Sequence, residues 1–433
     1  MPAPFSTSDR TTEFTAGVTN PNAVLSLLTS LFFTWGFITV INNTLLPHLR
    51  SVFDLNYTQT TLIESVWFIA YFFASIPSAR LIERIGYQMS MVTGLIIMAI
   101  GALMMIPAAR LPSYVATLCA LFVIACGITL LQVSANPYVA VVGTPETASA
   151  RLNLVQAFNS LGTTLAPLFG AYLILGRSAA GTAEAGHVLT SSERLADAQA
   201  VQLPYLIVAA VLVMLALVIA RFPLPALHGS GMRASAEQRG TLSLWRHRNL
   251  VFGIPAIFIY LIAEIGVANL FINFTSQPEI GNLNHEQGAH YLFLLWGGMM
   301  VGRFVGSALM NRASAEKVLA MAAIFAFVVM LIAALGSGQI AMWALISVGL
   351  FHSVMFPTIF TLGIKDLGPL TEEGAGLLVM AIAGGALVVV QGWLADTIGL
   401  QRSFLLTCAC ELYVLFYAVW GCKTQTRSAA SVE

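Results

Sequence analysis

Residues 114–142 read YVATLCALFVIACGITLLQVSANPYVAVV, a stretch without one charged side chain. A bilayer core of about 30 Å takes about 20 residues of α-helix to cross, and a helix satisfies its own backbone hydrogen bonds in hydrocarbon. The stretch is therefore long and apolar enough to be a transmembrane helix.

The rest of the chain has the same character. It is 58% hydrophobic and 9% charged, whereas soluble domains are roughly 25% charged. The sequence predicts an all-α polytopic membrane protein with twelve transmembrane helices. The predicted spans are 24–47, 58–82, 88–108, 114–142, 152–176, 203–222, 249–274, 288–310, 316–336, 339–363, 373–395 and 402–421.

The distribution of Lys and Arg predicts the orientation, because positively charged loops resist translocation. Twelve spans place both termini on one side, and fifteen of the twenty basic residues fall on that side. The other five are Arg50, Arg110, Arg177, Arg194 and Arg402. Both termini are therefore expected in the cytoplasm.

A polar stretch divides the spans six and six. Residues 223–248 contain Pro223, Pro225, Gly229 and four arginines, which is typical of a linker. Many transporters consist of repeats with the substrate site between them. We expect an N-terminal tail at 1–23, a six-helix bundle at 24–222, a cytoplasmic linker at 223–248, a second six-helix bundle at 249–421 and a cytoplasmic tail at 422–433.

Amide side chains recur inside the spans, where an unpartnered polar group is unfavourable. Several are three or four residues apart and so share a helix face. Amides both donate and accept hydrogen bonds, as sugar hydroxyls do, so such faces suit a neutral polyol; the alternative is bonding between the helices themselves. The candidate substrate-binding amides are Asn43, Gln132, Asn136, Gln156, Asn159, Asn269 and Asn273.

Aromatic rings in the spans can stack on the apolar face of a sugar, although such rings more often pack or anchor a helix at the interface. Trp35 and Tyr260 are the aromatic candidates for the substrate site.

Ionisable residues inside a membrane are rare and point to ion or proton pathways. The candidates for proton coupling are Glu264, His352 and Glu64, and Glu411 lies in the last span. A lone buried Glu can also be a protonated structural residue. Helix geometry places Tyr260 on the side of Glu264, whereas Asn269 and Asn273 lie on the other side.

Four strings of sequence extend this interpretation. They are LFFTWGFITVINNTLLPHL at 31–49, ITLLQVSANPYV at 128–139, TASARLNLVQAFNSLGTTLAPLFGA at 147–171 and MFPTIFTLGIKDLG at 355–368. On these strings the chain resembles the fucose–galactose–glucose:cation symporter family of the major facilitator superfamily, from about Ser26 to Glu411. The resemblance implies a bacterial inner-membrane importer of a monosaccharide that works by alternating access and is coupled to a cation gradient.

The resemblance also implies roles for single residues. The family's sugar-contacting amides match Gln156 and Asn159, and a family acid in the seventh span matches Glu264. Its acids in the first and fourth spans fall on Asn43 and Gln132, which carry no carboxyl group. Gln132 is similar to the glucose/galactose side of the family, whereas Asn43 departs from the pattern expected for proton coupling.

Other classes of protein lack their motifs here. There is no Gly-x4-Gly-Lys-Ser/Thr loop for a primary pump, and no histidine lies in a His-Glu-x-x-His pattern for a metal enzyme. We expect no enzyme activity, no cofactor, no metal and, at zero net charge, no nucleic-acid partner.

The expected partners are a monosaccharide, a coupling cation and the bilayer, with the chain acting as a monomer. A proton is preferred to sodium as the cation. The sugar can be glucose, galactose, fucose or an N-acetylhexosamine. A sodium-coupled or uncoupled carrier and a non-transporting sugar sensor stay open as alternatives.

Overall fold

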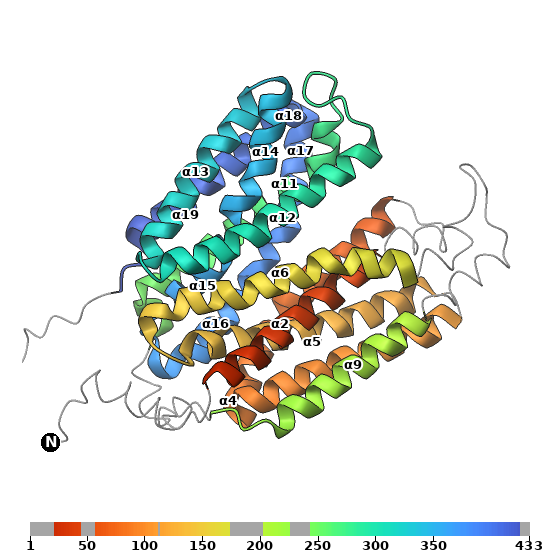
Figure 1. Ribbon diagram of the computed structural model, residues 1–433, viewed down its shortest axis with the longest axis vertical. Helices are drawn as coiled ribbons and strands as arrows, with labels where there is room; N and C mark the ends of the chain where they lie inside the picture. The colour runs from red at the N-terminus through yellow and green to blue at the C-terminus, as the bar shows by residue number, and fades with distance from the viewer. Residues whose placement is uncertain (1–20, 45–56, 111–112, 174–201, 226–242, 425–433) are drawn as a thin grey trace, which may run out of the picture. The chain divides into compact units, whose positions relative to one another are not determined.

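The structure is a computed structural model that describes residues 21–44, 57–110, 113–173, 202–225 and 243–424. Every regular element in these residues is helical (Figure 1). The α-helices of the first half are α2 (Pro21–Thr44), α4 (Tyr57–Arg110), α5 (Tyr114–Val141), α6 (Ala148–Leu173) and α9 (Gln202–Arg221). Those of the second half are α11 (Arg248–Thr275), α12 (His285–Met310), α13 (Ala315–Leu335), α14 (Gly338–His352), α15 (Met355–Ile364), α16 (Thr371–Met380), α17 (Val388–Ile398), α18 (Leu400–Ser403) and α19 (Leu405–Phe416).

Short helices of other types connect these elements. They are the 3₁₀ turns η1 (Pro145–Thr147), η3 (Leu244–Arg246), η4 (Gly368–Leu370) and η5 (Ala381–Leu387), and the π-helical turn η6 (Tyr417–Gly421). The eleventh predicted span is thus α16, η5 and α17 in succession, and the twelfth is α18, α19 and η6.

Ten helical stretches in the described residues are long and apolar enough to cross a membrane. The longest, Ser65–Ala108, is interrupted at Gly86, whose φ of 80° and ψ of 170° are readily adopted only by glycine. It therefore contains the second and third predicted spans. Helix α6, with 26 residues, stands at the fifth predicted span and completes the twelve. The predicted fold class, an all-α polytopic membrane protein, is confirmed.

The chain forms two compact units. Unit 1 comprises Met1–Val139 and Val155–Ala226, and unit 2 comprises Ala140–Leu154 and Leu227–Glu433. In unit 1, α4 and α9 pack side by side (Figure 1). In unit 2, α13 packs against α14 and α19, and α11 packs against η5 and α15. The domain boundaries expected from the sequence stay a prediction, and most of the expected linker lies outside the described residues.

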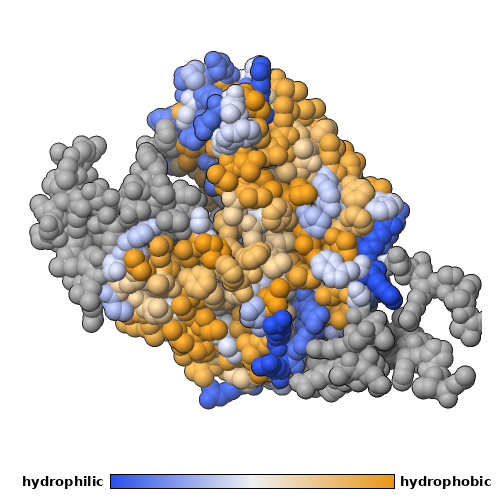
Figure 2. Space-filling model, turned by 180° about the vertical axis from the view of Figure 1, so that it is seen from behind, coloured by the Kyte–Doolittle hydropathy of each residue, from blue (hydrophilic) through white to orange (hydrophobic). Residues whose placement is uncertain are grey.

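The surface is apolar where a soluble protein would be polar. Ile340 is 72% exposed and Val389 67% exposed. Figure 2 shows hydrophobic residues over most of the described surface on the face that it presents. Contiguous exposed apolar surface of this kind is compatible with lipid and not with water.

Candidate functional site

The amides of α5 and α6 meet inside unit 1. Gln132, Asn136 and Gln156 are buried, at 5%, 0% and 4% exposure. The Gln156 Nε2 atom donates to Asn136 Oδ1 at 3.3 Å. The Asn136 amide nitrogen has no partner, although it is buried. Because a buried N–H group without a partner is unfavourable, this atom is a donor available to a ligand hydroxyl.

Tyr71 adds a hydroxyl group from α4 to this cluster. Gln132 Nε2 donates to the Tyr71 hydroxyl oxygen at 2.5 Å. Tyr71 is not among the site residues predicted from the sequence. The one signal it carried was a polar tip in an otherwise apolar stretch, which many interfacial tyrosines share.

Asn159 joins α6 to α2. Its Nδ2 atom donates to the Phe32 carbonyl oxygen at 2.8 Å. The two helices cross closely at glycines, because a Cβ atom at Gly36 would collide with Asn159 and one at Gly162 with the Phe33 carbonyl. Small residues allow such close approach between membrane helices.

Trp35, on the same stretch of α2, is 7% exposed and packs on Phe32 with ring centroids 5.3 Å apart. Hydrogen bonds from these side chains thus join α5 to α4, α5 to α6, and α6 to α2. We call Tyr71, Gln132, Asn136, Gln156 and Asn159 the amide cluster.

Two sequence candidates cannot be placed in this way. The side chains of Asn43 in α2 and Glu64 in α4 lie outside the part of the chain that the structure describes. Their predicted roles stay predictions.

In unit 2 the candidates of α11 separate onto two faces. Tyr260 is buried and Glu264 half-buried, whereas Asn269 and Asn273 are exposed. The Tyr260 hydroxyl donates to the His352 carbonyl oxygen at 2.9 Å, and the two rings meet edge to face at 5.7 Å. The structure therefore brings Tyr260 to His352 and leaves the two asparagines apart from them.

His352 ends α14 at a break in the tenth span. Two residues separate it from α15, which begins at Met355. Pro357 has no N–H group to give the Ser353 carbonyl, and Arg303 Nε donates to that carbonyl instead, at 3.1 Å. Side chains of α11 and α12 thus bond the carbonyl groups exposed at the break.

The His352 side chain is itself paired. Its Nε2 atom lies 2.7 Å from Glu411 Oε1, with the two side chains 2% and 0% exposed. Glu264 interacts electrostatically with both Arg303 and His352. Its carboxyl group also interacts with the Tyr260 hydroxyl group. We call Tyr260, Glu264, Arg303, His352 and Glu411 the ionisable cluster. Arg303 is not among the site residues predicted from the sequence, and the pairing of Glu411 with His352 was not predicted either.

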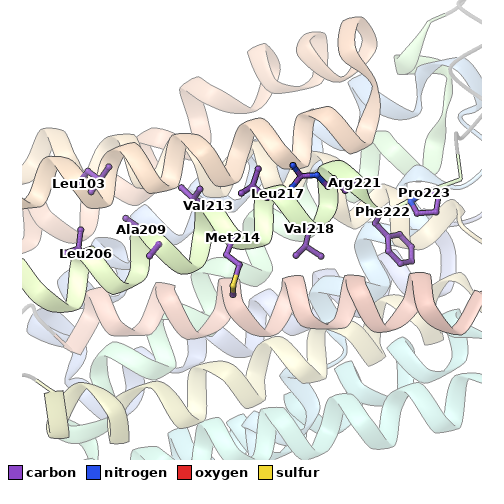
Figure 3. Close-up of a pocket in the computed structure, with 11 residues that line it drawn as sticks. Leu103, Leu206, Ala209, Val213, Met214, Leu217, Val218, Arg221, Phe222 and Pro223 are labelled. Atoms are coloured by element: carbon purple, nitrogen blue, oxygen red, sulfur yellow. The ribbon is translucent and has the colours of Figure 1, made fainter.

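The structure also has a groove of about 910 Å³ along α9 in unit 1 (Figure 3). Its walls are apolar side chains such as Leu206, Val213 and Met214, with Arg221 as the one charged lining residue. It lacks the convergent polar groups that a sugar requires. We therefore place the candidate site in the amide cluster and not in this groove.

No group of three or more His, Cys, Asp or Glu side chains in the described residues could hold a metal ion.

This chain is similar in sequence to curated sugar transporters. A glucose/galactose transporter of Brucella abortus is 45% identical over 95% of this chain and 97% of its own length. An L-fucose-proton symporter of Escherichia coli is 34% identical over 93% of both chains.

Solved structures agree in fold. A crystal structure of the E. coli fucose:proton symporter matches with a TM-score of 0.85 and 32% identity, over 93% of this chain and 99% of that one. The profile described as Major Facilitator Superfamily matches residues 27–374. This chain is therefore a multi-pass membrane transporter that belongs to the major facilitator superfamily, in the group of the glucose/galactose transporters and the fucose-proton symporters.

Proposed function

We propose that this protein imports a hexose such as glucose, galactose or fucose, together with a proton, by alternating access. The observation that carries the substrate class is the amide cluster. It offers donors and acceptors on α4, α5 and α6, and the described buried polar side chains of unit 1 are all uncharged. Such a lining suits a neutral polyol and disfavours an anionic or cationic substrate.

The roles of single residues follow from their contacts. Gln132, Asn136, Gln156 and Asn159 exchange their present hydrogen bonds for bonds to sugar hydroxyls, and the Trp35 ring covers an apolar face of the sugar. Asn43, Asn269, Asn273 and Tyr260 are proposed as further contacts. An N-acetylhexosamine remains within the proposed substrate class, because its extra amide also pairs with amide side chains.

The setting is also proposed. The protein lies in the inner membrane of a bacterium as a monomer, with both termini in the cytoplasm, and Glu264, His352 and Glu64 are the candidates for carrying the proton. The similarity to fucose-proton symporters supports the proton as the coupling cation. Sodium coupling, uncoupled transport and sugar sensing are the alternatives, because Asn43 and Gln132 lack carboxyl groups.

Counterflow in proteoliposomes tests the proposal. Purified protein is reconstituted with an excess of one unlabelled hexose inside, and the entry of a labelled sugar is followed for a panel of monosaccharides. We expect transient accumulation of at least one neutral hexose and none of a hexose phosphate. Absence of counterflow, combined with sugar binding in detergent, would instead identify a sensor.

An imposed pH gradient then identifies the cation. Proton symport predicts sugar accumulation when the outside is acidic, without sodium. Accumulation that requires a sodium gradient would replace the proton by sodium.

A further inference from the structure

The His352–Glu411 pair has an unusual environment for two ionisable groups. Both belong to helices that cross the membrane, and both side chains are almost fully buried. A charge in such a place is unfavourable unless it is paired. The 2.7 Å contact supplies one pairing, between Nε2 and Oε1.

The second oxygen of Glu411 has no partner. Glu411 Oε2 is buried without a hydrogen bond, and so is Thr407 Oγ1, one turn earlier on the same face of α19. An ionised carboxylate accepts several hydrogen bonds, and leaving one oxygen bare destabilises the ionised form. The contacts therefore favour a state in which the pair holds one labile proton.

The surrounding charges lead to the same proton count. Arg303 of α12 and Glu264 of α11 are close enough to offset each other electrostatically. The other titratable groups that face Glu411 are Tyr260 of α11 and Cys408 and Cys410 of its own helix. When Arg303 and Glu264 balance each other, as two charged or two neutral groups, and these three are neutral, the cluster has no net charge only if the His352–Glu411 pair keeps one proton.

The pair also adjoins the break in the tenth span. His352 is the last residue of α14, at the break in the tenth span, and its carbonyl is bonded by Tyr260. Discontinuous helices in transporters commonly form the sites of coupling ions. Losing the proton would leave a net negative charge in a buried place, so the pair can release it only after water or another charge reaches the break.

We propose that the His352–Glu411 pair is the proton-carrying site of this transporter, with one proton shared between Nε2 and Oε1 and released when the break rearranges. Tyr260 acts as a positioning residue, and Glu264 and Arg303 set the charge around the pair. The inference rests on the proposed proton symport. It assigns proton binding to residues of unit 2 that are not part of the amide cluster.

The experiment compares variants in proteoliposomes by two measurements. Counterflow under symmetrical pH reports sugar exchange, and sugar-induced alkalinisation of the external medium reports proton uptake. One pH unit across the membrane can support about tenfold accumulation for one proton per sugar. In Glu411→Gln we expect accumulation to fall from that value to about one, with counterflow within about threefold of wild type.

Matched variants separate the possible carriers. Glu316→Gln changes the same residue type in an exposed pair with Lys365, and it should keep full accumulation. Glu264→Gln removes a negative charge beside the pair, which disfavours protonation, so its accumulation should persist with a pH profile moved to more acidic values. If Glu264→Gln abolishes accumulation at every pH and Glu411→Gln does not, Glu264 is the carrier and the inference is wrong.

A second variant covers the case in which Glu411→Gln does not fold. The double variant His352→Gln, Glu411→Gln places two amides that can bond to each other, and it should exchange sugar without moving protons. Sugar accumulation by this double variant would overturn the inference. If wild type itself exchanges sugar without taking up protons, the proposed symport fails instead.

Discussion

The two units bury different kinds of polar residue. The described buried polar side chains of unit 1 are Ser, Thr, Asn and Gln, whereas those of unit 2 include His352, Glu372 and Glu411. Glu372 lies in the first turn of α16, where the helix N-terminus stabilises a carboxylate. The side chains of His352 and Glu411 contact each other at 2.7 Å. Both units bury uncharged polar side chains, whereas the buried His and Glu side chains of the described residues all lie in unit 2.

Asn43 and Gln132 of unit 1 carry amide groups where carboxyl groups were expected. The resemblance places acids of the family at these positions, and here both residues are amides. An amide can bind a sugar hydroxyl but carries no proton, so Asn43 and Gln132 can contact a sugar without taking part in proton transfer. The ionisable cluster of unit 2 contains side chains that can carry a proton.

The largest effect should be the loss of stability when the charged side chain of Arg303 in unit 2 is removed. Arg303→Ala deprives the Ser353 carbonyl of its donor and Glu264 of a nearby cation. Because the Arg303 side chain is half-buried, we expect a loss of about 2–4 kcal/mol in the free energy of unfolding. Thermal unfolding in detergent measures it.

Arg312→Ala is the matched control for that prediction, because Arg312 is exposed just beyond the end of α12. It should unfold like wild type. Equal unfolding temperatures for the two variants would show that the break is not stabilised by Arg303.

The next effect concerns the amide cluster. Gln156→Ala and Asn159→Ala should each weaken sugar binding by about 1–3 kcal/mol, or roughly 5- to 150-fold, because a sugar hydroxyl loses its partner. Equilibrium binding of labelled sugar to the detergent-purified protein measures the change. Asn311→Ala, at an exposed position after α12, should leave binding unchanged. Unaltered binding in both cluster variants would remove them from the site.

The sequence predicted much of this arrangement and missed a definable part. The apolar stretches predicted the spans, and spacing predicted which amides share a face of α5 or α6. Spacing along one helix says nothing of partners on another, so the Gln132–Tyr71 and His352–Glu411 contacts could not be predicted.

The break after His352 was hidden for a different reason. Residues 353–356 are Ser-Val-Met-Phe, which suit a continuous helix, and Pro357 alone does not fix where the helix ends. Helix geometry predicted that Glu264 and the two asparagines of α11 lie on different faces, but which face is buried depends on tertiary packing. The structure leaves Asn269 and Asn273 exposed.

The smallest effect concerns the predicted orientation of the chain across the membrane. A cysteine replacing Ser235, in a background without reactive native thiols, should not change transport, because the predicted linker has no contact with substrate. An impermeant thiol reagent should label it in inverted membrane vesicles and not in intact cells. Rapid labelling of intact cells would reverse the predicted topology.

The proposal that the amide cluster binds the sugar and the His352–Glu411 pair carries the proton is tested most directly by the number of protons taken up per sugar. The measurement records sugar-induced proton uptake and sugar influx in the same proteoliposomes, for wild type, Gln156→Ala and Glu411→Gln. We predict an unchanged ratio in Gln156→Ala, with transport requiring more sugar, and a ratio near zero in Glu411→Gln. A ratio that falls in Gln156→Ala, or that persists in Glu411→Gln, would contradict the assignment of sugar to the amide cluster and of the proton to the His352–Glu411 pair.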